Sequence, residues 1–283
     1  MKKKNFKCGF ILLSGFPNAG KSLLLNNLIK KKVSIVSPKI HTTRDVISGI
    51  LNIGDTQLIF SDTPGIGIVD EKKNYNKKLS RSISTIESIV DCNLFVLDVT
   101  RKIEKKTLTR ISKITSKFKK NHLILNKIDL VAKEKLLEVS NNVNSNINFF
   151  ETFMVSAKKR KGLNYLTERL SLQMPKNDWK YDRDVTTDKT INFQISEITR
   201  EKIFNLTNKE IPYSIKIETA IDDKTNLTKI FQKIFVLKGS QKSIIIGKKG
   251  DKIKMIGSKS RLDIEKLLKK KVFLNLVVKT KEN

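Results

Sequence analysis

The segment from Gly15 to Ser22 constrains this chain most, because Gly15-Phe16-Pro17-Asn18-Ala19-Gly20-Lys21-Ser22 fits the pattern G-x-x-x-x-G-K-[ST]. Apolar residues at 9–14 predict a buried strand before it, and residues 23–29 predict the first turns of a helix after it. Glycines let the backbone close around a phosphate, and the helix N-terminus adds partial positive charge. We expect Lys21 to reach the β- and γ-phosphates and the Ser22 hydroxyl to bind Mg²⁺.

The first part of the chain alternates strand and helix patterns, which predicts an α/β fold with a doubly wound sheet and ligand loops at the carboxyl ends of the strands. The predicted strands are 9–14, 46–53, 56–61, 93–99, 121–126 and 149–155. The predicted helices are 21–30, 76–90, 102–117, 131–140 and 162–172. Together these elements form a predicted nucleotide-binding domain at 1–175.

Residues 176–190 lack periodicity and are predicted to be a linker to a second domain at 191–283. This smaller α+β domain begins with a helix at Ile191. Its predicted order continues with strands at 213–220 and 230–238, helices at 243–256 and 259–270, and a strand at 272–279. A Gly-Lys-Lys-Gly loop at 247–250 is expected after the two strands and before the two helices of this domain.

Only nine of the 57 basic residues are arginine, and such an excess of lysine is typical of compositional bias. The net charge of +29 is therefore informative only where the basic residues are concentrated. Residues 238–271 hold twelve basic residues against three acidic ones, which favours nucleic acid as a partner first and an anionic membrane surface second. The sequence contains no apolar run of about 18 residues or more, so it predicts no transmembrane helix. Cys8 and Cys92 lie in or beside apolar strands, as is typical of buried thiols in a reducing cytoplasm.

Two elements after the phosphate loop are suited to Mg²⁺ and the γ-phosphate. In Asp62-Thr63-Pro64-Gly65, Asp62 would hold Mg²⁺ through water and the Gly65 N–H would meet the γ-phosphate. In Thr42-Thr43-Arg44-Asp45, a threonine could complete the Mg²⁺ shell only when the γ-phosphate is present. That dependence would make this loop a switch between two nucleotide states.

Two further elements predict that the base is guanine. Asn126-Lys127-Ile128-Asp129 follows an apolar strand, and the Asp129 carboxylate could accept hydrogen bonds from guanine N1–H and N2–H₂ together. Adenine lacks that donor pair, so such a site could discriminate by about 10⁴-fold or more. Ser156-Ala157-Lys158 follows the last strand, where a backbone N–H could meet guanine O6.

The source of catalysis is less direct, because Ile66 stands where Ras-like proteins carry the glutamine that orients the attacking water. We therefore expect slow intrinsic hydrolysis of GTP to GDP. The Asn18 carbonyl could bind a monovalent cation, such as K⁺, beside the phosphates in place of an arginine finger. The residues expected to carry hydrolysis are Lys21, Thr43, Gly65 and Asn18.

The whole chain resembles the bacterial Era family of GTPases. The resemblance is carried by Gly15 to Ser22, Thr42-Thr43-Arg44, Asp62 to Gly65, Asn126 to Asp129, Ser156 to Lys158, Ile191 to Leu206, Glu210 to Ser214, Gly239 to Gly250 and Lys271 to Leu276. It selects Thr43 as the Mg²⁺ ligand, and it implies that the second domain is a type II KH domain. Gly247-Lys248-Lys249-Gly250 would be its G-x-x-G loop, which holds single-stranded RNA.

The resemblance also implies the partner, which would be the 3′ region of small-subunit (16S) ribosomal RNA, and a role in late assembly of the 30S subunit. The bases would lie in an apolar groove, for which the candidates are Ile244, Ile245, Ile253 and Ile256, although for any one of them a place in the core is favoured. We expect a monomer in the cytoplasm, with weak peripheral contact with the inner membrane left open.

Three alternatives remain. One is an RNA-binding assembly factor with only incidental GTP turnover, which Ile66 favours. Another is a related GTPase of tRNA modification or of large-subunit assembly, because those relatives share the phosphate loop and the Thr-Thr-Arg segment. A membrane-docking face is a third possibility, since Leu262, Ile264, Leu267 and Leu268 lie at helical spacing in the basic run 259–271.

Overall fold

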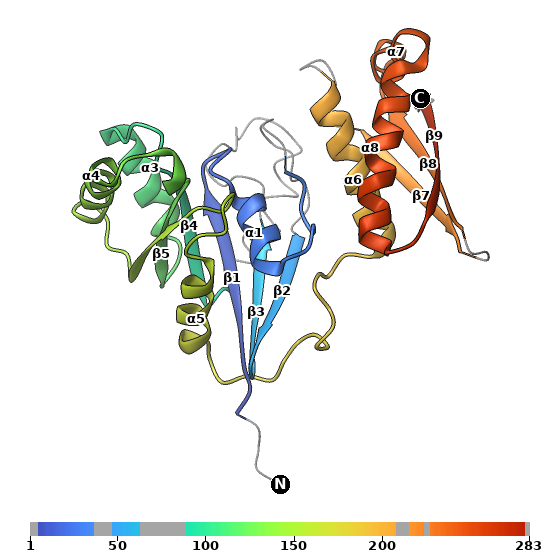
Figure 1. Ribbon diagram of the computed structural model, residues 1–283. Coiled ribbons are helices and arrows are strands. Elements are labelled where there is room, and N and C mark those ends of the chain that lie inside the picture. Colours follow the sequence, from blue (N-terminus) through green and yellow to red (C-terminus); the bar gives the residue numbers. More distant parts are fainter. Residues whose placement is uncertain (1–4, 37–46, 63–88, 208–214, 224–226, 281–283) are drawn as a thin grey trace. The chain divides into compact units, whose positions relative to one another are not determined.

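The computed structural model describes residues 5–36, 47–62, 89–207, 215–223 and 227–280, which fall into two compact units (Figure 1). The first unit takes the described residues up to Ser34 and those from Ile47 to Asp188. The second takes Ile35 and Val36 together with the described residues from Lys189 onward. The predicted helix at 76–90 lies almost wholly outside the described residues.

The first unit is built on a six-stranded sheet with the order β2-β3-β1-β4-β5-β6. Its strands are β1 (Lys7–Gly15), β2 (Ile47–Ile53), β3 (Thr56–Asp62), β4 (Cys92–Asp98), β5 (Asn121–Asn126) and β6 (Glu151–Val155). Neighbouring strands are parallel except for β2, which is antiparallel to β3. The carboxyl ends of β1, β3, β4 and β5 therefore meet at one edge of the sheet, where the predicted motif loops begin.

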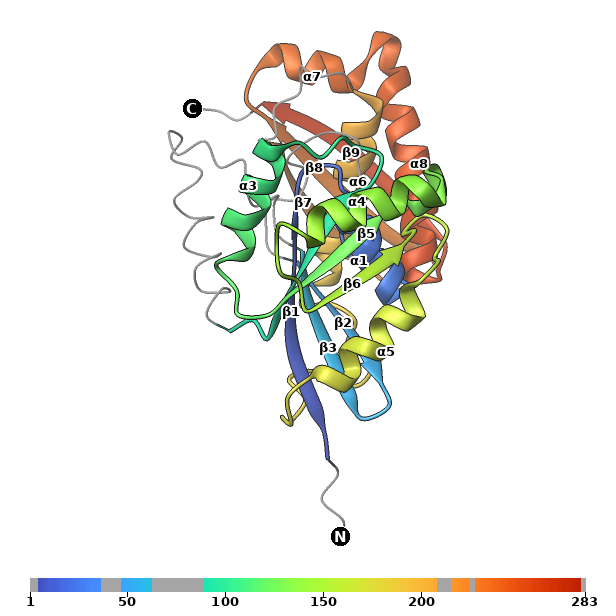
Figure 2. The same cartoon turned by 90° about the vertical axis from the view of Figure 1, so that its left-hand side faces the viewer.

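Helices cover both faces of this sheet. They are α1 (Lys21–Ile29), α3 (Lys105–Thr115), α4 (Lys133–Asn144) and α5 (Leu163–Gln173), with the short 3₁₀ turn η1 (Ile128–Leu130). In Figure 2, α3 and α5 lie on opposite sides of the sheet. β3 and β4 are buried along their whole length, so both faces of these strands are covered, as a central parallel sheet requires. The doubly wound α/β prediction is confirmed, with an antiparallel strand at one edge.

The segment that follows α5 lies against the first unit. The Ile50 N–H donates to Thr186 O at 3.0 Å, and Asn52 Nδ2 donates to Arg183 O at 2.8 Å, so the segment runs along the open edge of β2. The buried Gln57 side chain accepts from the backbone N–H groups of Lys180 and Tyr181. Most of the predicted linker at 176–190 is therefore grouped with the first unit, which extends to Asp188. The domain limits at 175 and 191 stay predictions.

The second unit has a three-stranded sheet, order β7-β8-β9, with helices on one face. Its elements are α6 (Ile191–Leu206), β7 (Lys216–Asp222), β8 (Thr228–Val236), α7 (Gly239–Ile246), η2 (Lys248–Gly250), α8 (Asp251–Leu268) and β9 (Val272–Thr280). β7 is antiparallel to β8, and β9 is parallel to β8. In β8, buried and more exposed residues alternate, because only one sheet face meets the helices.

The two central helices of this unit differ from the predicted ranges 243–256 and 259–270. The break falls at Gly247–Gly250, where Gly247 has φ +74 and Gly250 has φ +81. The predicted break near Gly257 is wrong, because that glycine continues α8. A Cβ there would lie 3.6 Å from Leu276 Cδ1, an ordinary van der Waals distance, so the packing does not require glycine, and α8 continues through this residue without a break.

Candidate nucleotide site and RNA groove

The phosphate loop joins β1 to α1, and two of its glycines are fixed by sterics. Gly15 has φ +132, and a Cβ there would lie 2.3 Å from Val96 O. Gly20 has φ +96, and a Cβ there would lie 2.4 Å from Asn126 Nδ2. A side chain at either position would therefore displace the strand or the asparagine behind the loop.

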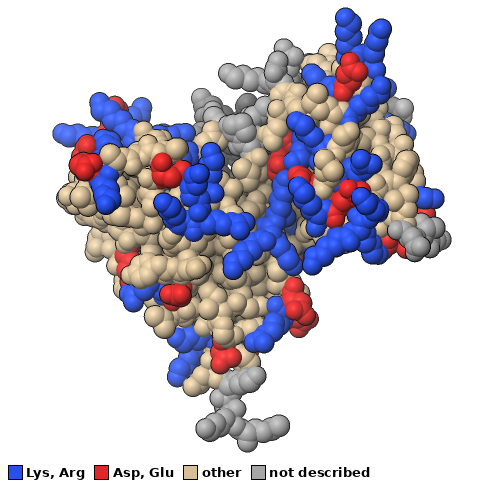
Figure 3. All heavy atoms as spheres, viewed as in Figure 1, with Lys and Arg blue, Asp and Glu red and all other residues tan. Residues whose placement is uncertain are grey.

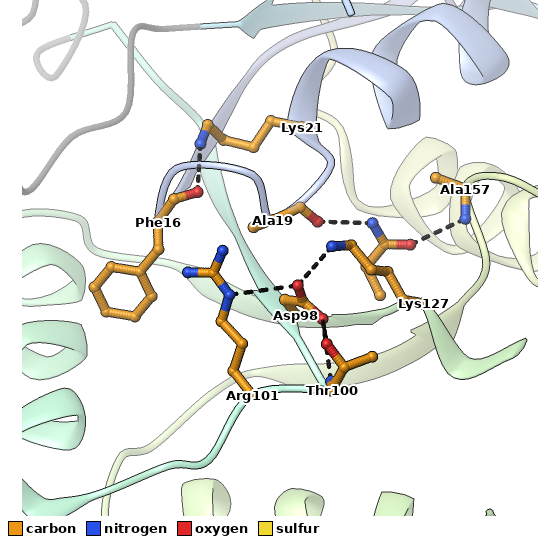
Figure 4. A network of polar contacts seen from close by, with 9 residues as sticks. Phe16, Ala19, Lys21, Asp98, Thr100, Arg101, Lys127 and Ala157 are labelled. Atoms are coloured by element: carbon orange, nitrogen blue, oxygen red, sulfur yellow. Dashed lines mark hydrogen bonds and ion pairs between the residues drawn. The ribbon is translucent and has the colours of Figure 1, made fainter. Parts of the chain in front are cut away.

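Two other loop residues were predicted to contact phosphate or a cation. Lys21 is buried, and its Nζ donates to Gly15 O and Phe16 O, each at 2.9 Å, so its charge lies inside the loop (Figure 4). Burial lowers the pKa of the Lys21 ammonium, and the nearby Asp62 carboxylate partly offsets this. Asn18 is exposed and has φ +62, a left-handed conformation that asparagine tolerates well.

Asp62 lies at the carboxyl end of β3 beside the first turn of α1. Its Oδ2 accepts from Ser22 Oγ at 2.6 Å and from Ser34 Oγ at 2.8 Å. The carboxylate is fully buried, and no donor among the described residues reaches Oδ1. Burial raises the pKa of Asp62, against the opposing effects of Ser22, Lys21 and Ser34. A buried carboxylate oxygen without a partner, next to a serine hydroxyl, fits the oxygen ligands that Mg²⁺ requires.

Asn126 joins three loops at the carboxyl edge of the sheet. Its Nδ2 donates to Ala19 O at 2.8 Å, and its Oδ1 accepts from the Ala157 N–H at 3.0 Å. Its own carbonyl accepts from the Val99 N–H at 3.2 Å. The side chain is 1% exposed, so these bonds are shielded from water. The structure therefore brings the phosphate loop, the 126–129 segment and the 156–158 segment together, as the sequence predicted.

Asp129 is exposed in η1 and accepts from Ser156 Oγ at 2.5 Å. That hydrogen bond is the main reason why the pKa of Asp129 lies below its ordinary value, so the carboxylate is charged and can accept. The Ala157 N–H is already used by Asn126. A guanine O6 would therefore need another N–H of this turn, or would have to replace that bond. Lys158 is exposed.

Several predicted residues lie outside the described part of the chain: Thr43, Thr63, Pro64, Gly65 and Ile66. Two residues that sequence reasoning missed belong to the site. Ser34 reaches Asp62 from the loop after α1, for which no sequence signal exists. Asp98 ends β4 and pairs with Lys127, and its place at the end of a buried strand was a usable signal.

The G-x-x-G loop of the second unit separates α7 from α8. A Cβ on Gly247 would lie 2.6 Å from Lys252 Cβ, whereas a Cβ on Gly250 would meet only Ile253, at 4.0 Å. Lys248 and Lys249 are exposed, and Lys249 has φ +50. The loop therefore presents two lysines to solvent directly before the N-terminus of α8, a suitable arrangement for backbone phosphates.

A groove of about 600 Å³ runs between α8 and β9. Its lining residues are Leu227, Ile253, Lys254, Gly257, Ser258, Arg261, Val272, Phe273, Leu274 and Leu276. Of the four candidate isoleucines, only Ile253 lines this groove. Ile245 and Ile256 are fully buried core residues, and Ile244 is a half-buried neighbour of the same core. The i, i+3, i+4 and i+7 spacing of Lys254, Gly257, Ser258 and Arg261 could have revealed this face of the helix.

Basic side chains cover much of the surface of the second unit visible in Figure 3. The apolar residues proposed for a membrane face are mostly core: Ile264 is buried, Leu267 and Leu268 pack on the same cluster, and Leu262 is exposed. Within the ranges described, no helix is long and apolar enough to cross a bilayer.

Comparison with family models gives two matches. Residues 10–127 match a family described as 50S ribosome-binding GTPase, and residues 210–283 match the KH domain family. GTPase Era of Trichlorobacter lovleyi is 38% identical over 286 residues, covering 100% of this chain and 95% of that relative. GTPase Era of Afipia carboxidovorans is 36% identical over 279 residues, covering 98% of this chain and 90% of that relative.

Two solved structures are similar over nearly the whole chain. One is an Era variant of Aquifex aeolicus bound to GDP·AlF4−, with a TM-score of 0.89 at 32% identity. The other is Era in complex with MgGDPNP and nucleotides 1506–1542 of 16S ribosomal RNA, with the same TM-score and identity. Each alignment covers 98% of this chain and 95% of the other.

Proposed function

The chain belongs to the Era family of GTPases, and from this premise we propose that it is a GTP-hydrolysing switch that binds the 3′ region of 16S ribosomal RNA and acts in late assembly of the small ribosomal subunit. The observation that carries the nucleotide half is the buried Asn126 side chain, which joins the phosphate loop to the 156–158 turn. The RNA half is supported by the basic G-x-x-G loop and the groove beside it.

The roles proposed for the nucleotide residues follow from their positions. Lys21 and the phosphate-loop N–H groups bind the phosphates, and Asp129 accepts from the guanine edge. Ser22 and Asp62 hold Mg²⁺, which would supply charge neutralisation between the β- and γ-phosphates when bound. Thr43 and Gly65, which lie outside the described residues, are proposed to complete the site in the GTP state.

A direct test compares the binding of GTP, GDP and ATP to the full-length chain. We expect GTP and GDP to bind and ATP to be rejected by about 10⁴-fold, because adenine leaves the Asp129 carboxylate unpaired. Phosphate release should be slow for the free protein. Equal affinity for ATP and GTP would contradict the guanine assignment.

We propose that K⁺ takes part in hydrolysis through Asn18. The support is chemical: Ile66 cannot orient water, and Asn18 places an amide in the exposed part of the phosphate loop. Turnover is measured in K⁺ and in Na⁺, with and without Asn18→Ala. Stimulation by K⁺ that disappears in the variant is the expected result, and equal rates in all four conditions would reject it.

In the RNA half, we propose that Lys248 and Lys249 neutralise phosphates, while Gly247 and Gly250 let the RNA backbone approach. Lys254 and Arg261 line the groove that would hold the bases. A single strand is favoured over a duplex because the G-x-x-G loop of a KH domain holds a few nucleotides of single-stranded RNA.

The alternative is an assembly factor that binds RNA and in which GTP turnover is incidental. Ile66 is the residue that favours it, since it removes the usual water-orienting side chain. Single-turnover hydrolysis is compared for the free protein and for the protein on isolated small subunits. We expect acceleration on the subunit; an unchanged rate would favour the alternative.

The protein is proposed to act as a monomer in the cytoplasm. A weak contact of the basic surface with an anionic membrane is the remaining question, and sedimentation with anionic liposomes tests it. Because most of the apolar face of α8 is already buried in the core, we expect little binding at physiological salt.

A further inference from the structure

A buried carboxylate that no motif includes lies next to the nucleotide site. Asp98 ends β4 and is 4% exposed. Its Oδ2 lies 2.5 Å from Lys127 Nζ and 3.5 Å from Arg101 Nε. Its Oδ1 accepts from the Thr100 N–H at 3.1 Å and from Thr100 Oγ1 at 2.7 Å (Figure 4). These partners together hold the carboxylate in place beside the Lys127 ammonium.

The backbone at Lys127 shows why such an anchor is useful. Lys127 has φ +71 and ψ +33, a left-handed conformation that is unfavourable for a residue with a side chain. Asn126 before it is held by the hydrogen bonds of its side chain, and Asp129 after it is held by Ser156. The bend at Lys127 sets the direction in which the chain leaves Asn126 and enters η1.

We propose that Asp98 is a positioning residue for guanine nucleotide: by holding the Lys127 ammonium, it fixes the bend that presents Asp129 to the base. The proposal rests on the proposed function of the same site. Asp98 would touch neither the base nor the phosphates, so it would act on nucleotide affinity and leave the chemical step unaffected.

A purely structural role explains this arrangement less well. Taking the Asp98 carboxylate out of water is unfavourable, while 31% of the Lys127 side chain that pairs with it stays exposed, and an apolar side chain in place of a buried charge is often at least as stable. The pair stands at the carboxyl edge of the sheet, and Asp98 lines a pocket of about 180 Å³ together with Phe16 and Ala19 of the phosphate loop. Burial raises the pKa of Asp98, but the hydrogen bonds from Lys127 and Thr100 bring it below its ordinary value, so this carboxylate is charged at neutral pH.

The test is a double-mutant cycle on nucleotide binding by the full-length protein. Dissociation constants for fluorescent GDP and for a fluorescent non-hydrolysable GTP analogue are measured for the wild type, Asp98→Asn, Lys127→Met and the double variant. We expect Asp98→Asn to weaken both nucleotides about tenfold, by the same factor, because a charged hydrogen bond is removed. The double variant should bind like Lys127→Met alone, since Asp98 acts through that lysine.

Steady-state kinetics separates positioning from general damage. Asp98→Asn should raise KM for GTP about tenfold and leave kcat unchanged, and Asp98→Glu should restore part of the affinity. The matched control is Lys135→Met, which removes a lysine from an exposed pair with Glu138 at 3.0 Å and should change neither constant. If Asp98→Asn does not fold, Thr100→Val takes its place; removing one support of the carboxylate should give a smaller loss in the same direction.

Three results would overturn the inference: unchanged nucleotide affinity in Asp98→Asn, additive losses in the double variant, or a fall in kcat with KM unchanged. Each of these leaves the proposed function standing, provided that the wild type binds GTP and rejects ATP. If the wild type does not bind guanine nucleotides, the proposed function itself fails, and the two failures are thus distinguishable.

Discussion

The two candidate sites of this chain are built in opposite ways. In the nucleotide site, Asp62, Asn126 and Ser156 are at most 1% exposed, and each makes hydrogen bonds to groups on other loops. In the candidate RNA site, Lys248 and Lys249 are exposed on the G-x-x-G loop. A substitution that leaves a buried polar group unpaired costs a large part of the binding free energy. Exposed lysines instead contribute to binding through long-range electrostatic attraction, which salt screens. Substitutions should therefore act steeply in the first site and gradually in the second.

The largest effect is expected from Asp129→Asn in the nucleotide site. The amide offers a donor where the carboxylate accepted, so GTP affinity should fall by up to about 10⁴-fold while xanthosine triphosphate gains. Competition binding with both nucleotides measures this. Retained GTP affinity would show that Asp129 does not read the base.

A matched pair of glycine substitutions compares the two loops directly. Gly20→Ala combines a positive φ with a 2.4 Å approach to Asn126 Nδ2, so nucleotide affinity should fall about 100-fold or more. Gly250→Ala has a similar positive φ but open space, and should cost about 1 kcal/mol, or about fivefold in RNA affinity. Both variants are titrated with nucleotide and with RNA. Similar losses of affinity in the two loops would argue against the predicted difference between the two sites.

Acid should destabilise the first unit through His122. This histidine is fully buried, and burial lowers its pKa from 6.5 to about 4. The unfolded chain therefore binds a proton that the folded chain does not, so stability is complete above about pH 6.5 and falls by about 2–3 kcal/mol as the pH drops toward 4.

Trp179 is the only tryptophan of the chain and packs against Phe6 in the first unit, so its fluorescence follows unfolding there. Urea unfolding of the wild type and of His122→Gln is compared at pH 7 and at about pH 4.5, between the folded and unfolded pKa values of this histidine. We expect the difference between the two proteins to depend on pH. A constant difference would remove His122 as the cause.

An effect much smaller than that of Asp129→Asn is expected for Lys248→Ala with Lys249→Ala in the candidate RNA loop. RNA affinity at moderate salt should fall about tenfold, and the slope of log K against log salt should decrease by about 0.7 for each phosphate that a lysine no longer neutralises. Lys102→Ala, at an exposed lysine of the first unit, is the control and should leave the slope unchanged. An unchanged slope in the double variant would place the RNA site elsewhere on the chain.

Local motifs predicted much of the fold and of the nucleotide site. The phosphate loop and the 126–129 segment were found because their residue types and spacing are set by one short stretch of backbone. The strands β1, β3, β4 and β5 lie within two residues of their predicted ranges for the same reason.

Features that depend on distant parts of the chain were not predicted. Ser34 meets Asp62, and Asp98 meets Lys127, only because the topology brings their loops to one edge. Ile253 lines the groove and Ile256 lies in the core because of the side of α8 that faces the sheet, which the sequence does not give. A helix break was wrongly predicted near Gly257 because the sequence alone does not distinguish a glycine inside a helix from a glycine that ends one. The roles of the site residues, including those outside the described ranges, stay predictions.

The central claim is that one chain joins a guanine nucleotide site to a groove for ribosomal RNA. Crosslinking of the intact protein to RNA, followed by sequencing and by mapping of the modified peptide, tests it most directly. We predict crosslinks between the 3′ region of small-subunit ribosomal RNA and the α8–β9 groove, and their loss in Lys248→Ala with Lys249→Ala. Crosslinks to transfer RNA or to large-subunit RNA, or a modified peptide remote from the groove, would contradict the account.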